Sequence, residues 1–199
     1  MRRLICLLML GCLLPVNALA HTNVTLAIQP LYQADYTTTL FSYEGEEKSV
    51  STSGCGATCV SMAMAFLNAK VEQTPETLLM WAYENDRYHG AGLSCKALVE
   101  MLQAYGFTGE WIGKEPKELR QALKKGHPAI ACMGPGTFTT SGHYILIYGI
   151  DPDDQLKVID PNSKKKSKRA YPLQTIFDEI SGSQAFLICQ WDGEGNGQR

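Results

Sequence analysis

The pattern of hydrophobic and polar residues divides the chain into a helical first half and a strand-rich second half. A run that is apolar on nearly all sides, residues 55–68, predicts a buried central helix. Capping and stop signals predict four more helices, at residues 75–85, 94–105, 116–125 and 173–180. Short apolar or alternating runs predict strands at residues 21–31, 129–133, 142–150, 156–160 and 185–191.

This order of elements predicts an α+β fold in which an N-terminal helical part packs on a largely antiparallel C-terminal sheet. The sequence shows no internal repeat and no domain linker, so we expect one domain over residues 21–199 with a core at about 24–191. The polar segment 44–48 is expected to be a loop, and the glycine-rich end of the chain is expected to be disordered.

Residues 1–20 have the pattern of a secretory signal. Arg2 and Arg3 precede an apolar run, and Ala18-Leu19-Ala20 forms a small-residue cleavage site before His21. The run is shorter than the ~20 apolar residues that span a bilayer, and no later segment is apolar enough to do so. We therefore expect an exported protein, secreted or periplasmic/cell-envelope, without stable membrane insertion. Cys12 lies in a poor lipoprotein motif, which disfavours lipidation.

The charge balance of the mature chain does not indicate nucleic-acid binding. Without the signal, 16 basic and 20 acidic residues remain, a net charge of −4. Five cations are concentrated in one run: Lys164, Lys165, Lys166, Lys168 and Arg169. The favoured interpretation of this run is a solvated hairpin tip, and the alternative is contact with an anionic wall, membrane or substrate.

The mature chain has five cysteines: Cys55, Cys59, Cys95, Cys132 and Cys189. An odd number in an exported chain fits one reactive thiol and up to two disulfides. Cys55 and Cys59 lie one helical turn apart, where Cβ atoms are ~5–6 Å from each other, whereas a disulfide needs ~3.5–4.5 Å. These two are not expected to bridge, and the pairing among Cys59, Cys95, Cys132 and Cys189 stays open.

Cys55 has the local context of a nucleophile. Gly54 and Gly56 on either side permit unusual backbone angles and the close approach of another chain segment. At a helix N-terminus the free N–H groups and the helix dipole favour a thiolate, which lowers a cysteine pKa from its usual ~8.5. Cys59, one turn further along, is expected to be a core residue.

His143 and Asp160 are the predicted partners of Cys55. His143 opens one predicted strand and Asp160 ends the next, so pairing through the turn at 151–154 would place them at the same end. A carboxylate there could accept the imidazole N–H and favour the charged ring. His89, in a loop, and His127, before a proline, are weaker candidates.

A metal site formed by Cys55, Cys59 and His143 is a further alternative. The Cys-x₃-Cys spacing lacks the second pair of ligands usual in structural zinc sites. We therefore predict no metal and no other cofactor.

These motifs together resemble a known family. Gly54-Cys55-Gly56-Ala57-Thr58, followed by Ser61-Met62-Ala63-Met64, is similar to the sGCGxTxxAM signature of papain-like cysteine peptidases related to bacteriocin-processing, double-glycine leader peptidases. The resemblance continues through residues 133–136, 141–144 and 159–163, so it spans about 32–187.

The resemblance implies a papain-like fold and a role for each site residue. Cys55 matches the nucleophile, His143 the general base and later acid, and Asp160 the residue that orients the histidine. Gln33 matches the glutamine that forms the oxyanion hole with the Cys55 backbone N–H, and Asn162 is an alternative orienting residue.

We therefore expect an exported cysteine peptidase that hydrolyses peptide bonds in peptide or protein substrates through a Cys-His-Asp triad and a thioester acyl-enzyme. Two alternatives remain: an inactive peptide-binding module of the same fold, and an amidase or transferase that acts on cell-wall peptides.

Overall fold

The fold is described from a computed structural model, which places residues 22–90 and 92–193. The predicted signal at 1–20 and most of the segment expected to be disordered lie outside these described residues. Within them, no helix combines the length and the apolar character needed to cross a membrane. The predicted export therefore stays a prediction from the sequence.

The described residues form six α-helices, two short 3-10 helices and nine strands. The α-helices are α1 (Val50–Ser53), α2 (Cys55–Leu67), α3 (Pro75–Glu84), α4 (Cys95–Ala104), α5 (Pro116–Lys124) and α6 (Leu173–Glu179), and the 3-10 helices are η1 (Gln33–Asp35) and η2 (Lys166–Lys168). The strands are β1 (Val24–Thr25), β2 (Phe41–Tyr43), β3 (Glu46–Lys48), β4 (Thr108–Ile112), β5 (Ala129–Met133), β6 (His143–Ile150), β7 (Gln155–Ile159), β8 (Ala170–Pro172) and β9 (Phe186–Gln190).

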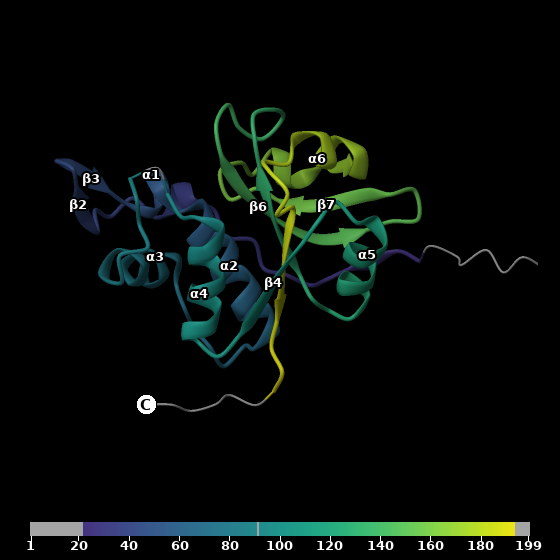
Figure 1. Ribbon diagram of the computed structural model, residues 1–199, viewed down its shortest axis with the longest axis horizontal. Coiled ribbons are helices and arrows are strands. Elements are labelled where there is room, and N and C mark those ends of the chain that lie inside the picture. Colours follow the sequence, from purple (N-terminus) through teal and green to yellow (C-terminus); the bar gives the residue numbers. More distant parts are fainter. Residues whose placement is uncertain (1–21, 91, 194–199) are drawn as a thin grey trace, which may run out of the picture.

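One antiparallel sheet organises the second half of the chain. Its strand order is β4-β9-β5-β6-β7-β8, and β1 pairs with the end of β6. Helices α1 to α4 lie together on one side of the molecule, and α5 and α6 lie with the sheet strands on the other side (Figure 1). The predicted α+β class with a mostly antiparallel sheet is confirmed.

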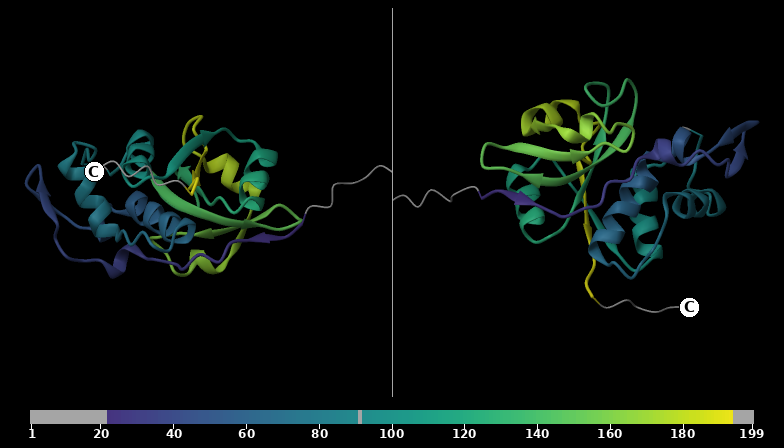
Figure 2. Two further views of the ribbon diagram at one scale, coloured as in Figure 1. Left: turned by 90° about the horizontal axis from the view of Figure 1, so that it is seen from below. Right: turned by 180° about the vertical axis from the view of Figure 1, so that it is seen from behind.

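The sheet separates two hydrophobic clusters. The first contains Ile130 and Leu146 of the central strands together with the buried residues of α2, α3 and α4. The second contains Ala129, Ala131 and Ile145 together with residues of α5 and α6. Neighbouring residues of β5 and β6 therefore point to opposite faces, as the period-2 geometry of a strand requires. Figure 2 shows the helical part and the sheet part from two further sides.

The helix boundaries follow the capping signals in the sequence. The Thr74 side chain accepts a hydrogen bond from the Thr77 N–H, and the Ser94 side chain accepts one from the Ala97 N–H. These bonds satisfy donors that the first helical turn leaves free. Helix α2 begins at Cys55, as predicted.

One predicted strand was wrong in extent, and four strands were not predicted. Residues 21–31 form only the two-residue strand β1, and the segment 44–48, expected to be a loop, forms the turn and the second strand of the hairpin β2–β3. Glu44 and Gly45 make its turn with φ values of 52° and 83°, as a two-residue hairpin turn requires. Strands β4 and β8 were missed because both are edge strands that carry exposed or polar residues and so lack a continuous apolar pattern.

Gly54 is required for close approach and not for an unusual backbone angle. Its φ is −100°, so the expectation of a special conformation there was wrong. A Cβ atom on Gly54 would lie 2.6 Å from Val50 Cγ1 and 2.7 Å from the Val50 backbone. Only glycine therefore allows α1 to turn directly into α2.

We predict that Gly54→Ala lowers the free energy of unfolding by roughly 1–3 kcal/mol, because the backbone of α1 must move to make room for the methyl group. Urea unfolding of the two chains measures the change. Gly113→Ala is the matched control, since a Cβ atom at Gly113 meets no atom within 4 Å. Equal unfolding midpoints for Gly54→Ala and wild type would contradict this account of the turn.

Candidate active site

Cys55 is the first residue of α2, and its side chain is half-buried. Its backbone N–H belongs to the first helical turn, where N–H groups have no partner within the helix. Cys59 is fully buried, and its thiol donates to the Tyr144 carbonyl oxygen at 3.5 Å. Burial raises the pKa of the Cys59 thiol. The structure therefore places one thiol at the surface of the site and the other in the core.

His143 and Asp160 are brought together by the pairing of β6 with β7. The two strands pair with Leu146 opposite Ile159, and His143 Nε2 donates to Asp160 Oδ1 at 2.7 Å. His143 is 8% exposed and Asp160 is fully buried. The backbone N–H of Asn162 donates to the same Asp160 oxygen at 2.8 Å, so Asn162 supports Asp160 instead of replacing it.

The protonated form of His143 is favoured by its neighbours. Burial lowers the pKa of His143, but the hydrogen bond with Asp160 and the neighbouring Cys55 thiol outweigh burial and raise this pKa to about 9. Since Nε2 is bonded to Asp160, Nδ1 is the ring nitrogen that remains for Cys55. The arrangement thus provides a thiol, an imidazole and a carboxylate in series.

The loop that leads to His143 is anchored on α6. The backbone N–H of Thr137 donates to Glu179 Oε2 at 2.8 Å, and its hydroxyl donates to Glu179 Oε1 at 2.6 Å. The N–H of Gly134 donates to the Glu179 carbonyl oxygen at 2.7 Å. A Cβ atom on Gly136 would lie 2.3 Å from Glu179 Cδ, which explains the glycine in this segment. Glu179 therefore holds the segment 134–137 that precedes β6.

The basic run contributes an unpredicted residue to the site. Lys166 Nζ lies 3.9 Å from Asp160 Oδ2 and donates to the Phe138 carbonyl oxygen at 3.0 Å. Among the described residues Asp160 Oδ2 accepts no hydrogen bond. The Lys166 ammonium group is the positive charge that compensates this buried oxygen. Lys164 Nζ forms an ion pair with Asp35 at 3.1 Å. Two lysines of the run, Lys164 and Lys166, therefore contact other residues of the fold. The charge pattern of the sequence did not predict these contacts.

Gln33 is buried between the two segments that carry Asp160 and Cys55. Its backbone N–H donates to the Pro161 carbonyl oxygen at 2.8 Å, and its side-chain Nε2 donates to the Ser51 carbonyl oxygen at 3.0 Å. Nε2 makes no other hydrogen bond among the described residues, so one amide N–H of Gln33 remains available. This position is compatible with the predicted role in an oxyanion hole.

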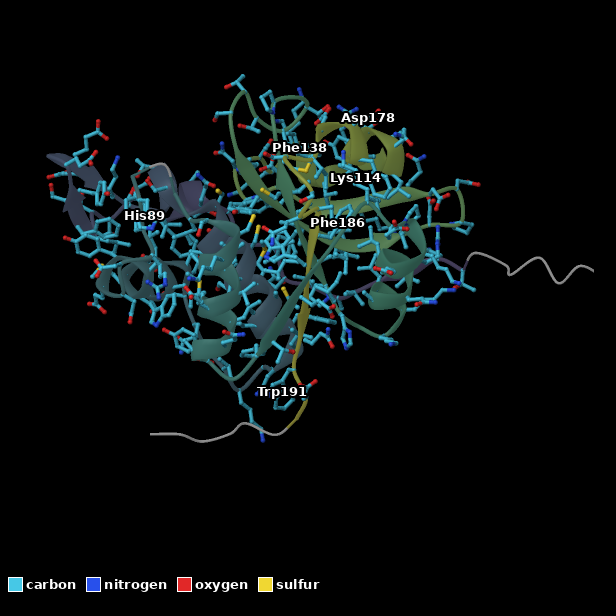
Figure 3. All side chains as sticks on the ribbon, viewed as in Figure 1. His89, Lys114, Phe138, Asp178, Phe186 and Trp191 are labelled. Atoms are coloured by element: carbon cyan, nitrogen blue, oxygen red, sulfur yellow. The ribbon has the colours of Figure 1, made fainter. Side chains whose placement is uncertain are left out.

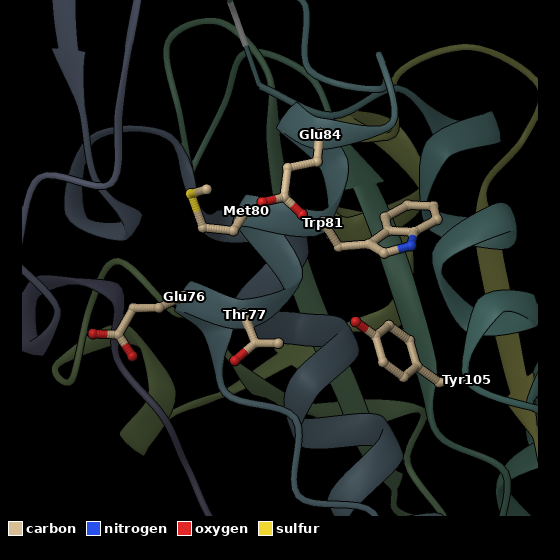
Figure 4. A pocket seen from close by; sticks show the side chains of 6 residues that line it. All are labelled: Glu76, Thr77, Met80, Trp81, Glu84 and Tyr105. Atoms are coloured by element: carbon tan, nitrogen blue, oxygen red, sulfur yellow. The ribbon is translucent and has the colours of Figure 1, made fainter.

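Other polar features lie apart from this arrangement. His89 is exposed on the helical side of the molecule (Figure 3). His127 lies at the junction of α5 and β5. A groove of about 420 Å³ on α3 is lined by none of the predicted site residues (Figure 4); its lining residues are Glu76, Thr77, Met80, Trp81, Glu84 and Tyr105. Within the described residues, no group of three or more acidic, histidine or cysteine side chains is arranged to hold a metal ion.

We predict that Asp160→Asn lowers the pKa of His143 from about 9, because the charged hydrogen-bond partner is lost while burial remains. An NMR titration of the His143 ring measures this pKa directly. Asp178→Asn, a change of an exposed aspartate on α6, is the matched control and should leave the value in place.

The raised pKa of His143 also predicts that the free energy of unfolding depends on pH. The folded pKa lies above the ~6.5 of an unfolded chain, so this group stabilises the fold fully below pH ~6.5. The contribution is lost as the pH rises through about 9.

For the Asp160→Asn titration, a His143 pKa equal to or above the wild-type value would contradict the assigned hydrogen bond.

Comparisons with known proteins identify the chain's relatives. A model of the Peptidase_C39 like family matches residues 25–185, which is most of the chain. No curated protein matches the sequence.

Three similar solved structures share the fold at low sequence identity. The peptidase domain of Streptococcus ComA, a bi-functional ABC transporter involved in a quorum sensing pathway, is 17% identical; the match covers 71% of this chain and 93% of that chain, with a TM-score of 0.53. A double glycine motif protease from an AMS/PCAT transporter, solved in complex with its leader peptide, is 16% identical, with coverage of 84% and 96% and a TM-score of 0.52. Xylellain, a cysteine protease from Xylella fastidiosa, is 13% identical, with coverage of 85% of each chain and a TM-score of 0.57.

Proposed function

We propose that this chain, which belongs to the Peptidase_C39 like family of cysteine-type peptidases, hydrolyses peptide bonds with Cys55 as nucleophile, His143 as general base and acid, and Asp160 as the residue that orients His143. The family match confirms the resemblance that the motifs indicated and the class of cysteine-type peptidase. The observation that carries this assignment is the contact of His143 Nε2 with Asp160 Oδ1 at 2.7 Å, together with the Cys55 thiol as a group that raises the pKa of His143.

The first half of the reaction forms an acyl-enzyme. The Cys55 thiolate attacks the carbonyl carbon of the peptide bond, and a tetrahedral oxyanion forms. The free N–H of Cys55 and the available amide N–H of Gln33 donate to this oxyanion. His143 then gives its Nδ1 proton to the leaving amine, and a thioester on Cys55 remains.

The second half releases the product. His143, now neutral, takes a proton from water, and the resulting hydroxide attacks the thioester carbonyl. The carboxylic acid product leaves and the Cys55–His143 pair is restored. Asp160 keeps the ring in position throughout, because Nε2 stays bonded to its carboxylate.

The proposed substrate is a peptide or protein segment that the enzyme meets after export. The transporter protease of similar fold is solved with a leader peptide, which supports a peptide substrate here. Export, to a secreted or periplasmic/cell-envelope location, is proposed from the pattern of residues 1–20. Contact with an anionic surface is proposed through the exposed members of the basic run, Lys164, Lys165, Lys168 and Arg169, and salt would weaken it.

We predict that Cys55→Ala reduces peptide hydrolysis to background, a loss of roughly 10⁴-fold or more, because no other group in the series can form the thioester. Cleavage of a peptide library by the mature chain measures this. Cys59→Ala, the matched control one turn away, should keep activity within a few fold although it loses packing in the core.

A thiol-directed peptidase inhibitor provides a second measurement on the same chains. Selective labelling of Cys55 in wild type, with hydrolysis of the library, supports the proposal. Wild-type activity that persists in Cys55→Ala would refute the nucleophile. Labelling without hydrolysis of any peptide would instead favour amidase or transferase chemistry, and no selective labelling would favour an inactive binding module.

We predict that Gln33→Ala lowers kcat by ~10²–10³-fold with a small change in KM, since the lost N–H acts on the oxyanion and not on the bound ground state. Steady-state kinetics on a cleaved library peptide provide the comparison. Gln29→Ala, which truncates an exposed glutamine, is the control and should not change kcat. An unchanged kcat in Gln33→Ala would remove Gln33 from the oxyanion hole.

A further inference from the structure

Two cysteines that the proposed mechanism does not use lie in direct contact. Cys95 Sγ and Cys132 Sγ are 3.8 Å apart, although the residues belong to different layers of the fold. Cys95 is the first residue of α4, and Cys132 lies on the central strand β5. Both side chains are half-buried, so a small reagent can reach the pair from solvent.

We propose that Cys95 and Cys132 form a dithiol site that a disulfide oxidant closes into an intrachain disulfide, and that this bond ties α4 to the central sheet beside the site. The sulfur atoms already touch, and they must approach by about 1.8 Å to reach the ~2.05 Å of a disulfide bond.

The surroundings assign different roles to the two thiols. The hydrogen bond with Cys132 outweighs the opposing effect of burial and lowers the pKa of Cys95 to about 6. The hydrogen bond with Cys95 and burial both raise the pKa of Cys132. Cys95 is also the first residue of α4, where the helix dipole favours an anion, so Cys95 is the attacking thiolate and Cys132 the thiol that resolves the intermediate.

The reaction balances with a disulfide, RSSR, as the oxidant. The Cys95 thiolate attacks one sulfur of RSSR, which forms a mixed disulfide on Cys95 and releases the first thiolate RS⁻. That thiolate takes the Cys132 proton, and Cys132 attacks Cys95 Sγ and displaces the second RS⁻. The second RS⁻ takes from solvent the proton that Cys95 released on ionising. In total two protein thiols lose two electrons and two protons, and one RSSR is reduced to two RSH.

The remaining cysteines do not offer this chemistry. Cys59 and Cys189 are fully buried, and their thiols donate to backbone carbonyl oxygens, of Tyr144 and Leu187 respectively. Burial raises the pKa of both thiols, which disfavours the thiolate that exchange requires. Of the pairings that the sequence left open, the structure therefore selects one.

The proposed bond lies next to the peptidase site. Cys132 is opposite Tyr144 in the β5–β6 register, and Tyr144 follows His143 in the chain. The Tyr144 hydroxyl donates to the Leu93 carbonyl oxygen at 3.0 Å, just before α4. A disulfide between α4 and β5 would thus fix the position of α4 relative to the paired strands β5 and β6, of which β6 carries His143.

The test uses the mature chain with Cys55→Ala, so that no mixed disulfide can form at the nucleophile. The protein is equilibrated in glutathione buffers from reducing to oxidising, free thiols are alkylated, and intact mass and linked peptides are measured. We expect two of the four remaining thiols to become protected together, with Cys95 and Cys132 in one linked peptide.

Matched variants separate the two roles. Adding Cys132→Ser should stop the reaction at a glutathione adduct on Cys95, adding Cys95→Ser should prevent the bridge, and adding Cys189→Ser should leave it intact. Thermal unfolding of the oxidised chain should occur about 10 °C above that of the reduced chain, and the Cys95→Ser chain should lose this difference. Cys95→Ser keeps the test informative if the strand variant at Cys132 fails to fold.

Three results would overturn the proposal: no protected pair at any buffer composition, a glutathione adduct on Cys95 that never resolves, or a bridge between other cysteines. None of these readouts depends on peptide hydrolysis. A failed dithiol and a failed peptidase assignment are therefore distinguishable.

Discussion

The close packing of helix α2 against strand β6 is the constraint on which the site depends. A Cβ atom on Gly56 would lie 3.2 Å from the ring of Tyr144, so the helix and the strand meet with almost no space between them. One turn further along, the buried Cys59 thiol is bonded to the Tyr144 carbonyl oxygen. Because both contacts involve the residue that follows His143, they set the position of Cys55 relative to the imidazole. A reactive thiol needs this precision, since small displacements weaken proton transfer strongly.

Burial of the Asp160 carboxylate is the main electrostatic cost of this design. A fully buried charge is strongly destabilising unless it is paired and hydrogen-bonded. The chain supplies compensation from three places: the His143 ring, the Asn162 backbone and the Lys166 ammonium group. The same environment that holds Asp160 favours the charged form of His143, so the stabilising contacts and the reactive state of the site have one physical origin.

Two cysteines occupy the same kind of position and have different neighbours. Cys55 and Cys95 are each the first residue of a helix, where the backbone N–H groups have no partner within the helix. Cys55 has an imidazole beside it, which suits nucleophilic attack on a carbonyl group. Cys95 has a second thiol beside it, which suits exchange with a disulfide. The helix terminus provides reactivity, and the neighbour determines which reaction follows.

The sequence by itself determined the features that depend on residues close to one another along the chain. Caps at Thr74 and Ser94, the buried run after Cys55 and the strand that His143 opens could all be predicted, because capping and periodicity are local effects. The hairpin β2–β3 and the edge strands could not be predicted, since half-exposed strands lack the apolar pattern. Only the tertiary structure decided that Lys166 turns inward to Asp160 and that Cys95 meets Cys132. The physical reason is that both contacts depend on how layers pack, and a linear pattern of residues does not record the distance between side chains that are remote in the chain.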